Sequence, residues 1–171
     1  MKFNVLLLDA YGRAQERVHA VLGDLTPEQL AVRPGGGGNS IGWLIWHLAR
    51  VQDDHIADSA GTEQQWLAED WVARFGLPLD PQDTGYGHNP DQVDQVRVRS
   101  AGLLRDYFDS VHAGTVRFLR SLDEADLDRI VDTRWDPPVT LGVRLVSVVD
   151  DCLEHCGQAA YVKGMLGRGG A

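Results

Sequence analysis

The sequence predicts an all-α fold, a four-helix bundle with a long crossover connection between its second and third helices. Four segments repeat apolar residues with the 3.6-residue period of a helix. No run of alternating apolar and polar residues is long enough to predict a sheet. The roughly 40 residues between the second and third segments are too many for the short loop of a simple up-and-down bundle.

The first predicted helix spans residues 3–23, where apolar residues recur on one face and Gly23 supplies a stop. Thr26 followed by Pro27 is the pattern of an N-cap with proline at the first helical position, which predicts one short turn of helix. The glycine run at 35–38 lacks the Lys-Ser/Thr of a phosphate-binding loop and follows no strand. We therefore interpret it as a flexible connector.

The second predicted helix begins after Ser40 and runs to about Ser59. His47 lies at the border of its apolar face, where a side chain can reach the bundle interior. His55 falls nearer the centre of that face, and we interpret it as a hydrogen-bonded core histidine rather than an extra metal ligand. Trp46 falls on the polar side, which indicates an exposed ring and a contact surface for another subunit.

Residues 60–98 form a long connection, with a short helical stretch at 63–75 followed by prolines and glycines that exclude a long regular element. Connections of this length usually carry function or cover a site. His88 within it is either a substrate contact or simply exposed. The connection also holds four aromatic residues, too many for a solvated linker, which we expect to line a pocket: Trp66, Trp71, Phe75 and Tyr86.

The third predicted helix opens at Asp91 or Asp94 and continues to Leu122. Residues 133–138 contain two consecutive prolines, which predicts a rigid extended loop. Thr140 then caps a final helix that reaches about Leu166. Residues 167–171 are expected to form a frayed tail.

The final helix carries the clearest chemical pattern. Asp151 and His155 stand four residues apart, which places both side chains on one face about one turn apart. Paired metal ligands have this spacing, and so does a histidine hydrogen-bonded to a carboxylate. Together with His47 they would provide three protein ligands and leave a coordination position for water or substrate.

We expect this site to be surrounded by residues near His47 on the second helix and by one histidine of the long connection. Asp54 is either a hydrogen-bond acceptor that orients a ligand imidazole or a solvated carboxylate. Four residues are assigned to a supporting role or a substrate pocket: Asp54, His55, Trp43 and His88.

Composition and charge exclude several classes of function. The net charge is −9, from 16 Lys and Arg against 25 Asp and Glu, and no basic cluster is present, so nucleic-acid and anionic-membrane binding are disfavoured. The N-terminal apolar run ends at Asp9, unlike an export signal, and no run approaches the roughly 20 residues of a transmembrane helix. We expect a cytoplasmic protein in which residues 1–171 form one domain. Cys152 and Cys156 are expected to be reduced core residues.

Two segments resemble a known family. Ser40–Ala49, which contains Trp-His-Leu, and Glu154–Tyr161, which contains His-Cys-Gly-Gln, are similar to the two signatures of the DinB/YfiT-like superfamily, especially its mycothiol-dependent maleylpyruvate isomerase-like branch. The resemblance implies a four-helix bundle that holds a divalent metal, usually zinc or nickel. The matching positions are His47, Asp151 and His155. Many members have histidine in place of Asp151, and a carboxylate there lowers the charge of the site and changes metal selectivity.

The resemblance also implies a class of function. Family members of known function use low-molecular-weight thiols such as mycothiol or bacillithiol as isomerases or S-transferases, so we expect a thiol-dependent detoxification enzyme acting on small electrophiles. The chain ends after the predicted fourth helix, without the second domain of the isomerase, so isomerisation of maleylpyruvate itself is not expected. Two alternatives are a noncatalytic metal- or small-molecule-binding module in stress response, and a metal-free helical homodimer.

Overall fold

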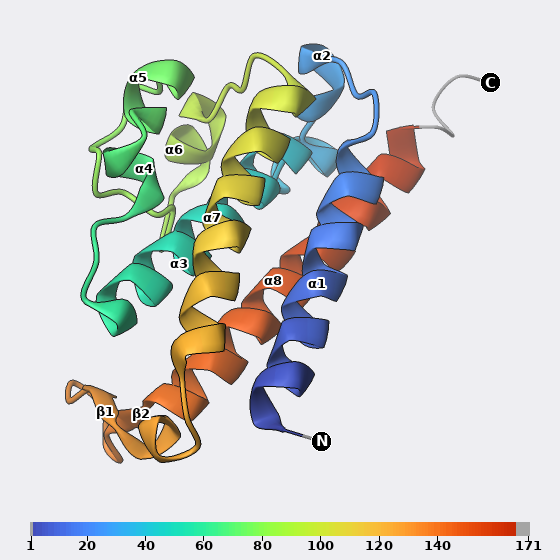
Figure 1. Ribbon diagram of the computed structural model, residues 1–171. Coiled ribbons are helices and arrows are strands. Elements are labelled where there is room, and N and C mark those ends of the chain that lie inside the picture. Colours follow the sequence, from blue (N-terminus) through green and yellow to red (C-terminus); the bar gives the residue numbers. More distant parts are fainter. Residues whose placement is uncertain (1, 167–171) are drawn as a thin grey trace.

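Four long helices make up the bundle: α1 (Phe3–Leu22), α3 (Ile41–Ala60), α7 (Ala101–Ser121) and α8 (Leu141–Leu166). The computed structural model describes residues 2–166, so the predicted tail at 167–171 lies outside the described residues. Helices α1 and α3 each pack against both α7 and α8. In Figure 1, α1 and α8 run in one direction and α3 and α7 in the other, so the chain between α3 and α7 has to cross from one end of the bundle to the other. The predicted all-α bundle with a long crossover is confirmed.

Capping side chains set the starts of the predicted helices. The Ser40 hydroxyl oxygen accepts a hydrogen bond from Trp43 N at 3.2 Å, which starts α3. Thr140 caps the first turn of α8 in the same way, at 3.3 Å. Thr26 opens the short helix α2 (Pro27–Leu30) with a capping box. Local polar residues therefore determine where these helices begin.

The connections contain short elements of their own. Two strands, β1 (Ile130–Asp132) and β2 (Val139–Thr140), pair antiparallel in the connection from α7 to α8. They flank the predicted extended loop, whose two ends return to each other before α8 begins. None of the helices in residues 2–166 has both the length and the apolar composition needed to cross a bilayer. The remaining short helices are η1 (Pro34–Gly36), α4 (Gln65–Ala68), α5 (Trp71–Phe75), α6 (Pro90–Gln95) and η2 (Ala125–Asp128).

The third long helix begins later than predicted. Asp91 and Asp94 belong to the separate helix α6, and the chain leaves the helical conformation at Val96 (φ −80°, ψ 76°). Helix α7 then starts after Ser100, whose hydroxyl oxygen caps it. Val96 and Val98 are both buried. An extended stretch places these two side chains on one face, whereas a continuous helix would have turned them to opposite sides.

Trp46 is buried, which corrects the prediction that it is exposed. Only 1 % of its surface is accessible. Its ring meets Trp66 edge-on, with centroids 6.5 Å apart, and stacks with His88 at 6.0 Å. Both partners belong to the crossover segment, defined as residues 61–100, which covers the polar side of α3. Trp46 therefore offers no surface to a second subunit.

Three of the four aromatic residues of the crossover segment differ from the prediction, whereas Tyr86 lines a cavity as expected. Trp66, Trp71 and Phe75 are buried in the core instead of lining a pocket. Their rings surround Tyr107 of α7, with centroid distances of 5.1 to 5.7 Å. Tyr86 remains 89 % exposed. The crossover segment is thus held to the bundle by its own aromatic side chains.

A buried carboxylate attaches the crossover segment to α3. Asp53 accepts hydrogen bonds from the backbone N–H groups of Gln65 and Trp66, both at 2.8 Å. It also accepts one from the Tyr107 hydroxyl at 2.9 Å. The Asp53 side chain therefore joins α3 both to the first turn of α4 and to α7.

Arg50 makes a second attachment from the same helix. Its side chain is fully buried and donates hydrogen bonds to Gln64 Oε1 at 2.8 Å and to the Asp83 carbonyl oxygen at 3.1 Å. Its guanidinium lies 3.6 Å from the Asp53 carboxylate and over the Trp66 ring. This network was not anticipated from the sequence, because it joins residues that are 3 to 33 positions apart.

Replacing Asp53 by alanine should lower the free energy of unfolding by about 3 kcal/mol or more, because three buried donors would lose their acceptor. The matched control is Asp58→Ala on the same helix, an exposed carboxylate for which we expect a change within about 0.5 kcal/mol. Urea denaturation of both variants measures the difference. Equal stabilities would contradict the attachment role of Asp53.

Candidate metal centre

Three ligand-forming side chains converge between α3 and α8. His47 comes from the buried part of α3, and Asp151 and His155 come from successive turns of α8. One ligand atom of each residue lies within 4.8 Å of the others. His155 Nε2 is 3.6 Å from Asp151 Oδ1, and the ring centroids of His47 and His155 are 4.9 Å apart. The three groups are therefore close enough to share one ion.

Both imidazoles are oriented by a hydrogen bond at Nδ1. His47 Nδ1 contacts the backbone carbonyl oxygen of Thr84, and His155 Nδ1 lies 3.2 Å from Gln158 Oε1. Because a carbonyl oxygen can only accept, each Nδ1 carries a proton, which leaves Nε2 as the atom that can bind a metal when the ring is neutral. Metal-binding histidines are commonly supported in this way.

The environment of His47 keeps its ring neutral. Burial lowers the pKa of His47 from 6.5 to about 4, and the nearby His155 and His88 act in the same direction. The hydrogen bond to Thr84 opposes this effect without cancelling it. At pH 7 the imidazole is therefore in the form that binds a metal.

Asp151 has a buried oxygen, Oδ2, with no hydrogen-bond donor among residues 2–166. Burial raises the pKa of this carboxyl, His155 lowers it, and the neighbouring Glu154 and Asp150 raise it. An unpaired buried carboxylate oxygen costs free energy, and a bound cation would offset that cost. Two imidazoles and a carboxylate are donors that suit a divalent ion, so these residues fit a metal.

Residues 83–88 of the crossover segment support the α3 side of the site. Trp43 stacks on the His47 ring, with centroids 4.5 Å apart and planes 15° apart. Trp43 Nε1 donates a hydrogen bond to His88 Nδ1 at 3.1 Å, and His88 Nε2 lies 2.9 Å from Asp83 Oδ2. The His88 side chain is only 2 % exposed. It therefore holds Trp43 in place and is not a substrate contact.

Gly85 permits the close approach of this segment to His47. Its φ is 88°, and a Cβ atom at this position would lie 2.8 Å from His47 Nδ1. Neither Thr84 nor Gly85 was singled out from the sequence. The two glycines of Gly85-Tyr86-Gly87, which both have positive φ, were the one available signal of a constrained turn.

Asp54 and His55 lie beside the ligand cluster and not in it. In the described part of the chain no hydrogen bond joins Asp54 to His47, whose orienting partner is Thr84 instead. His55 is half-buried, and its Nε2 lies 3.3 Å from Arg144 Nη1. It is therefore neither a core histidine nor an extra ligand. Both side chains line the neighbouring cavity.

That cavity has a volume of about 580 Å³ and opens directly beside His47 and Asp151. Its walls come from α3, α8, the β1–β2 hairpin and the Thr84–Tyr86 part of the crossover segment. This volume is in the range of small-molecule sites. A molecule bound there would reach the candidate metal centre.

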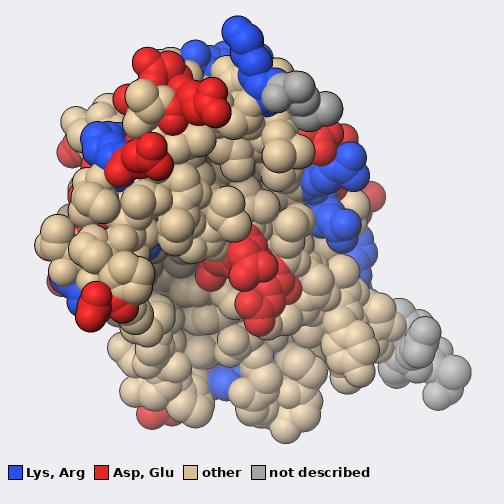
Figure 2. Space-filling view, turned by 90° about the horizontal axis from the view of Figure 1, so that it is seen from below, with Lys and Arg blue, Asp and Glu red and all other residues tan. Residues whose placement is uncertain are grey.

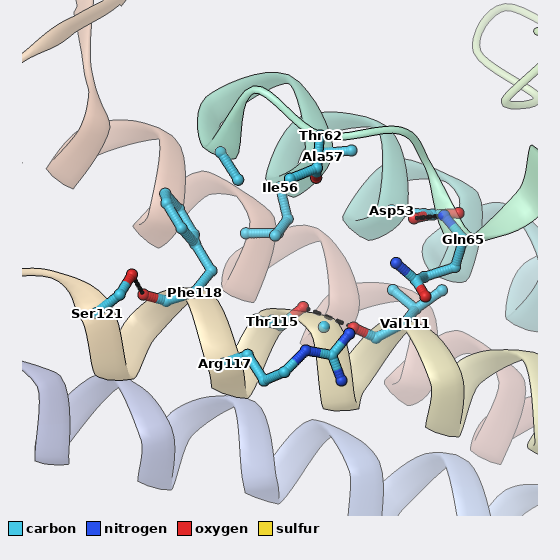
Figure 3. Close-up of a pocket in the computed structure, with 12 residues that line it drawn as sticks. Asp53, Ile56, Ala57, Thr62, Gln65, Val111, Thr115, Arg117, Phe118 and Ser121 are labelled. Atoms are coloured by element: carbon cyan, nitrogen blue, oxygen red, sulfur yellow. Dashed lines mark hydrogen bonds between the residues drawn. The ribbon is translucent and has the colours of Figure 1, made fainter. Parts of the chain in front are cut away.

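A second cavity, of about 350 Å³, lies between α3 and α7 and contains none of the three ligand-forming residues. Figure 3 shows the Asp53 carboxylate against Gln65 at one end and Phe118 toward the other. Asp53 is already bonded to the first turn of α4. This cavity is thus separate from the candidate metal centre.

The charge distribution favours cations. Figure 2 shows Asp and Glu side chains grouped in the middle of one face beside a hollow, with most Lys and Arg nearer the edges. Together with the net charge of −9, this surface would attract metal ions.

The two cysteines have no place in the site. Cys152 and Cys156 are free and buried, as expected from the sequence. Burial raises the pKa of Cys152 well above its ordinary value and that of Cys156 to about 12. Thiols in this state are poor nucleophiles.

Comparison with known proteins agrees with the fold and with the sequence resemblance. A family model described as the DinB superfamily matches residues 10–159. A conserved protein from Enterococcus faecalis, of known crystal structure, is 34 % identical over 95 % of this chain and 96 % of its own, with a TM-score of 0.89. A DinB-like protein from Bacillus cereus is 19 % identical over 94 % of this chain and 91 % of its own, with a TM-score of 0.62, and shows the same fold. The search of curated proteins found no match.

The family match includes all three ligand-forming residues, the whole of α3 and α7, and the larger part of α1 and α8. The protein therefore belongs to the DinB superfamily.

Proposed function

We propose that the protein binds one divalent ion, zinc or nickel, through His47, Asp151 and His155, and that it is an enzyme that transfers a low-molecular-weight thiol of the mycothiol or bacillithiol type to small electrophiles. The observation that carries the proposal is the convergence of these side chains beside a cavity, with a buried and unpaired oxygen on Asp151. Three protein ligands would leave at least one coordination position for a substrate.

A divalent ion held there would supply Lewis acidity, which lowers the pKa of a bound thiol. The protein's own residues would hold the ligands rigid: Thr84 fixes the tautomer of His47, and Trp43 limits the rotation of its ring. In the transfer, the thiol proton leaves to solvent and the sulfur forms a bond to the electrophilic carbon. The leaving group departs with its bonding electron pair.

The family resemblance supports the thiol, and the cavity supports a small second substrate. The alternative of a noncatalytic binding module would use the same ion and the same cavity, so only turnover distinguishes the two. The metal-free homodimer is disfavoured because it would leave Asp151 Oδ2 unpaired.

Purified protein should bind about one zinc or nickel ion per chain, and His155→Ala should weaken binding by more than about 100-fold, since even the loss of a supporting hydrogen bond can cost 10- to 100-fold. His19→Ala, which removes a histidine near the protein surface bonded to Asp109, is the matched control and should bind normally. Isothermal titration calorimetry and elemental analysis give the affinity and stoichiometry. Unchanged binding by His155→Ala would remove this residue from the site.

The metal-free protein should lose stability as the pH falls below about 6.5, because the unfolded chain then protonates a histidine that stays neutral when folded. With a folded pKa of about 4 for His47, the loss attributable to this residue between pH 7 and pH 5 is about 2 kcal/mol. His47→Gln should show a correspondingly flatter dependence. Denaturation in the presence of a chelator at several pH values measures the slopes, and parallel curves for wild type and His47→Gln would refute the buried neutral state.

Metal-loaded protein should consume mycothiol or bacillithiol in the presence of a suitable electrophile, as followed by free-thiol titration across a panel of electrophiles. Activity should depend on the ion and fall to background in Asp151→Ala. Full metal loading without thiol consumption would favour the noncatalytic binding module.

A further inference from the structure

The cavity beside the candidate metal centre changes character along its length. Helices α3 and α8 run antiparallel along it (Figure 1). Moving away from the metal centre, each helix therefore places a ligand-forming residue first, then an apolar residue and then a polar residue on the cavity wall. On α3 these residues are His47, Val51 and His55. On α8 they are Asp151, Val148 and Arg144.

Helix geometry gives the length of this series. With a rise of about 1.5 Å per residue, Arg144 lies about 10 Å from Asp151 along α8, and His55 lies about 12 Å from His47 along α3. The two ends of the cavity are therefore separated by a distance that one small molecule can span, with an apolar stretch between them.

The far end holds two arginines, Arg134 and Arg144, together with the carboxylates of Asp132 and Asp54. Asp132 accepts hydrogen bonds from Arg134, at 3.0 and 2.8 Å, and from Arg144 Nη2 at 2.8 Å. Two guanidinium groups thus share one carboxylate. Arg144 Nη1 lies 3.3 Å from His55 Nε2. The Nε–H of Arg144 has no acceptor among residues 2–166. The Arg144 side chain is 14 % exposed, so it is mostly removed from water but still reaches the cavity.

Two exposed aromatic rings border the same cavity. Tyr86, from the crossover segment, is 89 % exposed, and Trp135, from the tip of the hairpin, is 64 % exposed. Large apolar rings left open beside a cavity are typical of ligand-contacting surfaces. They supply apolar cover for the part of a ligand that lies between the two ends.

We propose that the thiol substrate is an acid, with an anionic group about 10 Å from its sulfur, and that Arg144 binds this group while the sulfur reaches the metal centre. The inference rests on the proposed function and adds the chemical class of its substrate. Arg134 contributes positive charge at the same end. Two carboxylates of α3, Asp54 and Asp58, also lie near this end and act on Arg134. Asp54 accepts a hydrogen bond from Gln64.

The test uses straight-chain thiols that differ only in length and in their far end, which is a carboxylate, an alcohol or an amine. Binding to zinc-loaded protein is measured by calorimetry, and binding of sulfur is followed in cobalt-loaded protein by its near-ultraviolet sulfur-to-cobalt absorption. Once the chain is long enough to span about 10 Å, the acid should bind more than about tenfold tighter than the alcohol of equal length. Shorter acids should show no such advantage.

Arg144→Gln should abolish the preference for the acid, and Arg144→Lys should retain part of it. Arg134→Gln, which alters a side chain that is 81 % exposed, should weaken the preference without a risk to folding. Arg120→Gln on α7, an exposed arginine away from the cavity, is the control and should behave as wild type.

Equal affinities for acid and alcohol, or a preference for the amine, would overturn the inference if the sulfur-to-cobalt absorption is present, and would leave the proposed function intact. An acid preference that persists in Arg144→Gln would overturn the role of Arg144. Absence of that absorption with every thiol, at full metal loading, would refute the proposed function and the inference with it.

Discussion

The buried carboxylate of Asp53 is the constraint on which the rest of the structure depends. It accepts two backbone hydrogen bonds from the start of α4 and one from Tyr107, and thereby joins the crossover segment to two long helices. Arg50 extends this attachment to Asp83. The next residue, Thr84, then places its carbonyl oxygen on His47. The orientation of one metal-ligand candidate is therefore determined by a polar network one to two turns further along α3.

The parts of the molecule that could be predicted from the sequence depend on local spacing. Helix starts followed from capping residues such as Ser40 and Thr140, which act within three residues. The relation of Asp151 to His155 followed from the helical repeat alone. The approach of His47 to this pair required only that a bundle brings the borders of two apolar faces together.

The parts that could not be predicted depend on contacts between distant residues. The polar side of α3 indicated solvent at Trp46, but the crossover segment covers it with Trp66 and His88. The hydrogen-bond partner of His47 is the backbone carbonyl of Thr84, 37 residues away. A backbone group cannot be recognised from the pattern of side chains in the sequence. No role for Arg144 was predicted from the sequence, because its proposed role depends on its contacts with His55 and Asp132 in the folded protein.

The central claim is that two imidazoles and one carboxylate share an ion, and the ligand shell of that ion tests it most directly. An X-ray absorption spectrum of the zinc-loaded protein should show only nitrogen and oxygen neighbours, at about 2.0 to 2.2 Å, with the outer scattering of two imidazole rings. A shell that contains cysteine sulfur at about 2.3 Å, or that lacks imidazole scattering, would contradict the account.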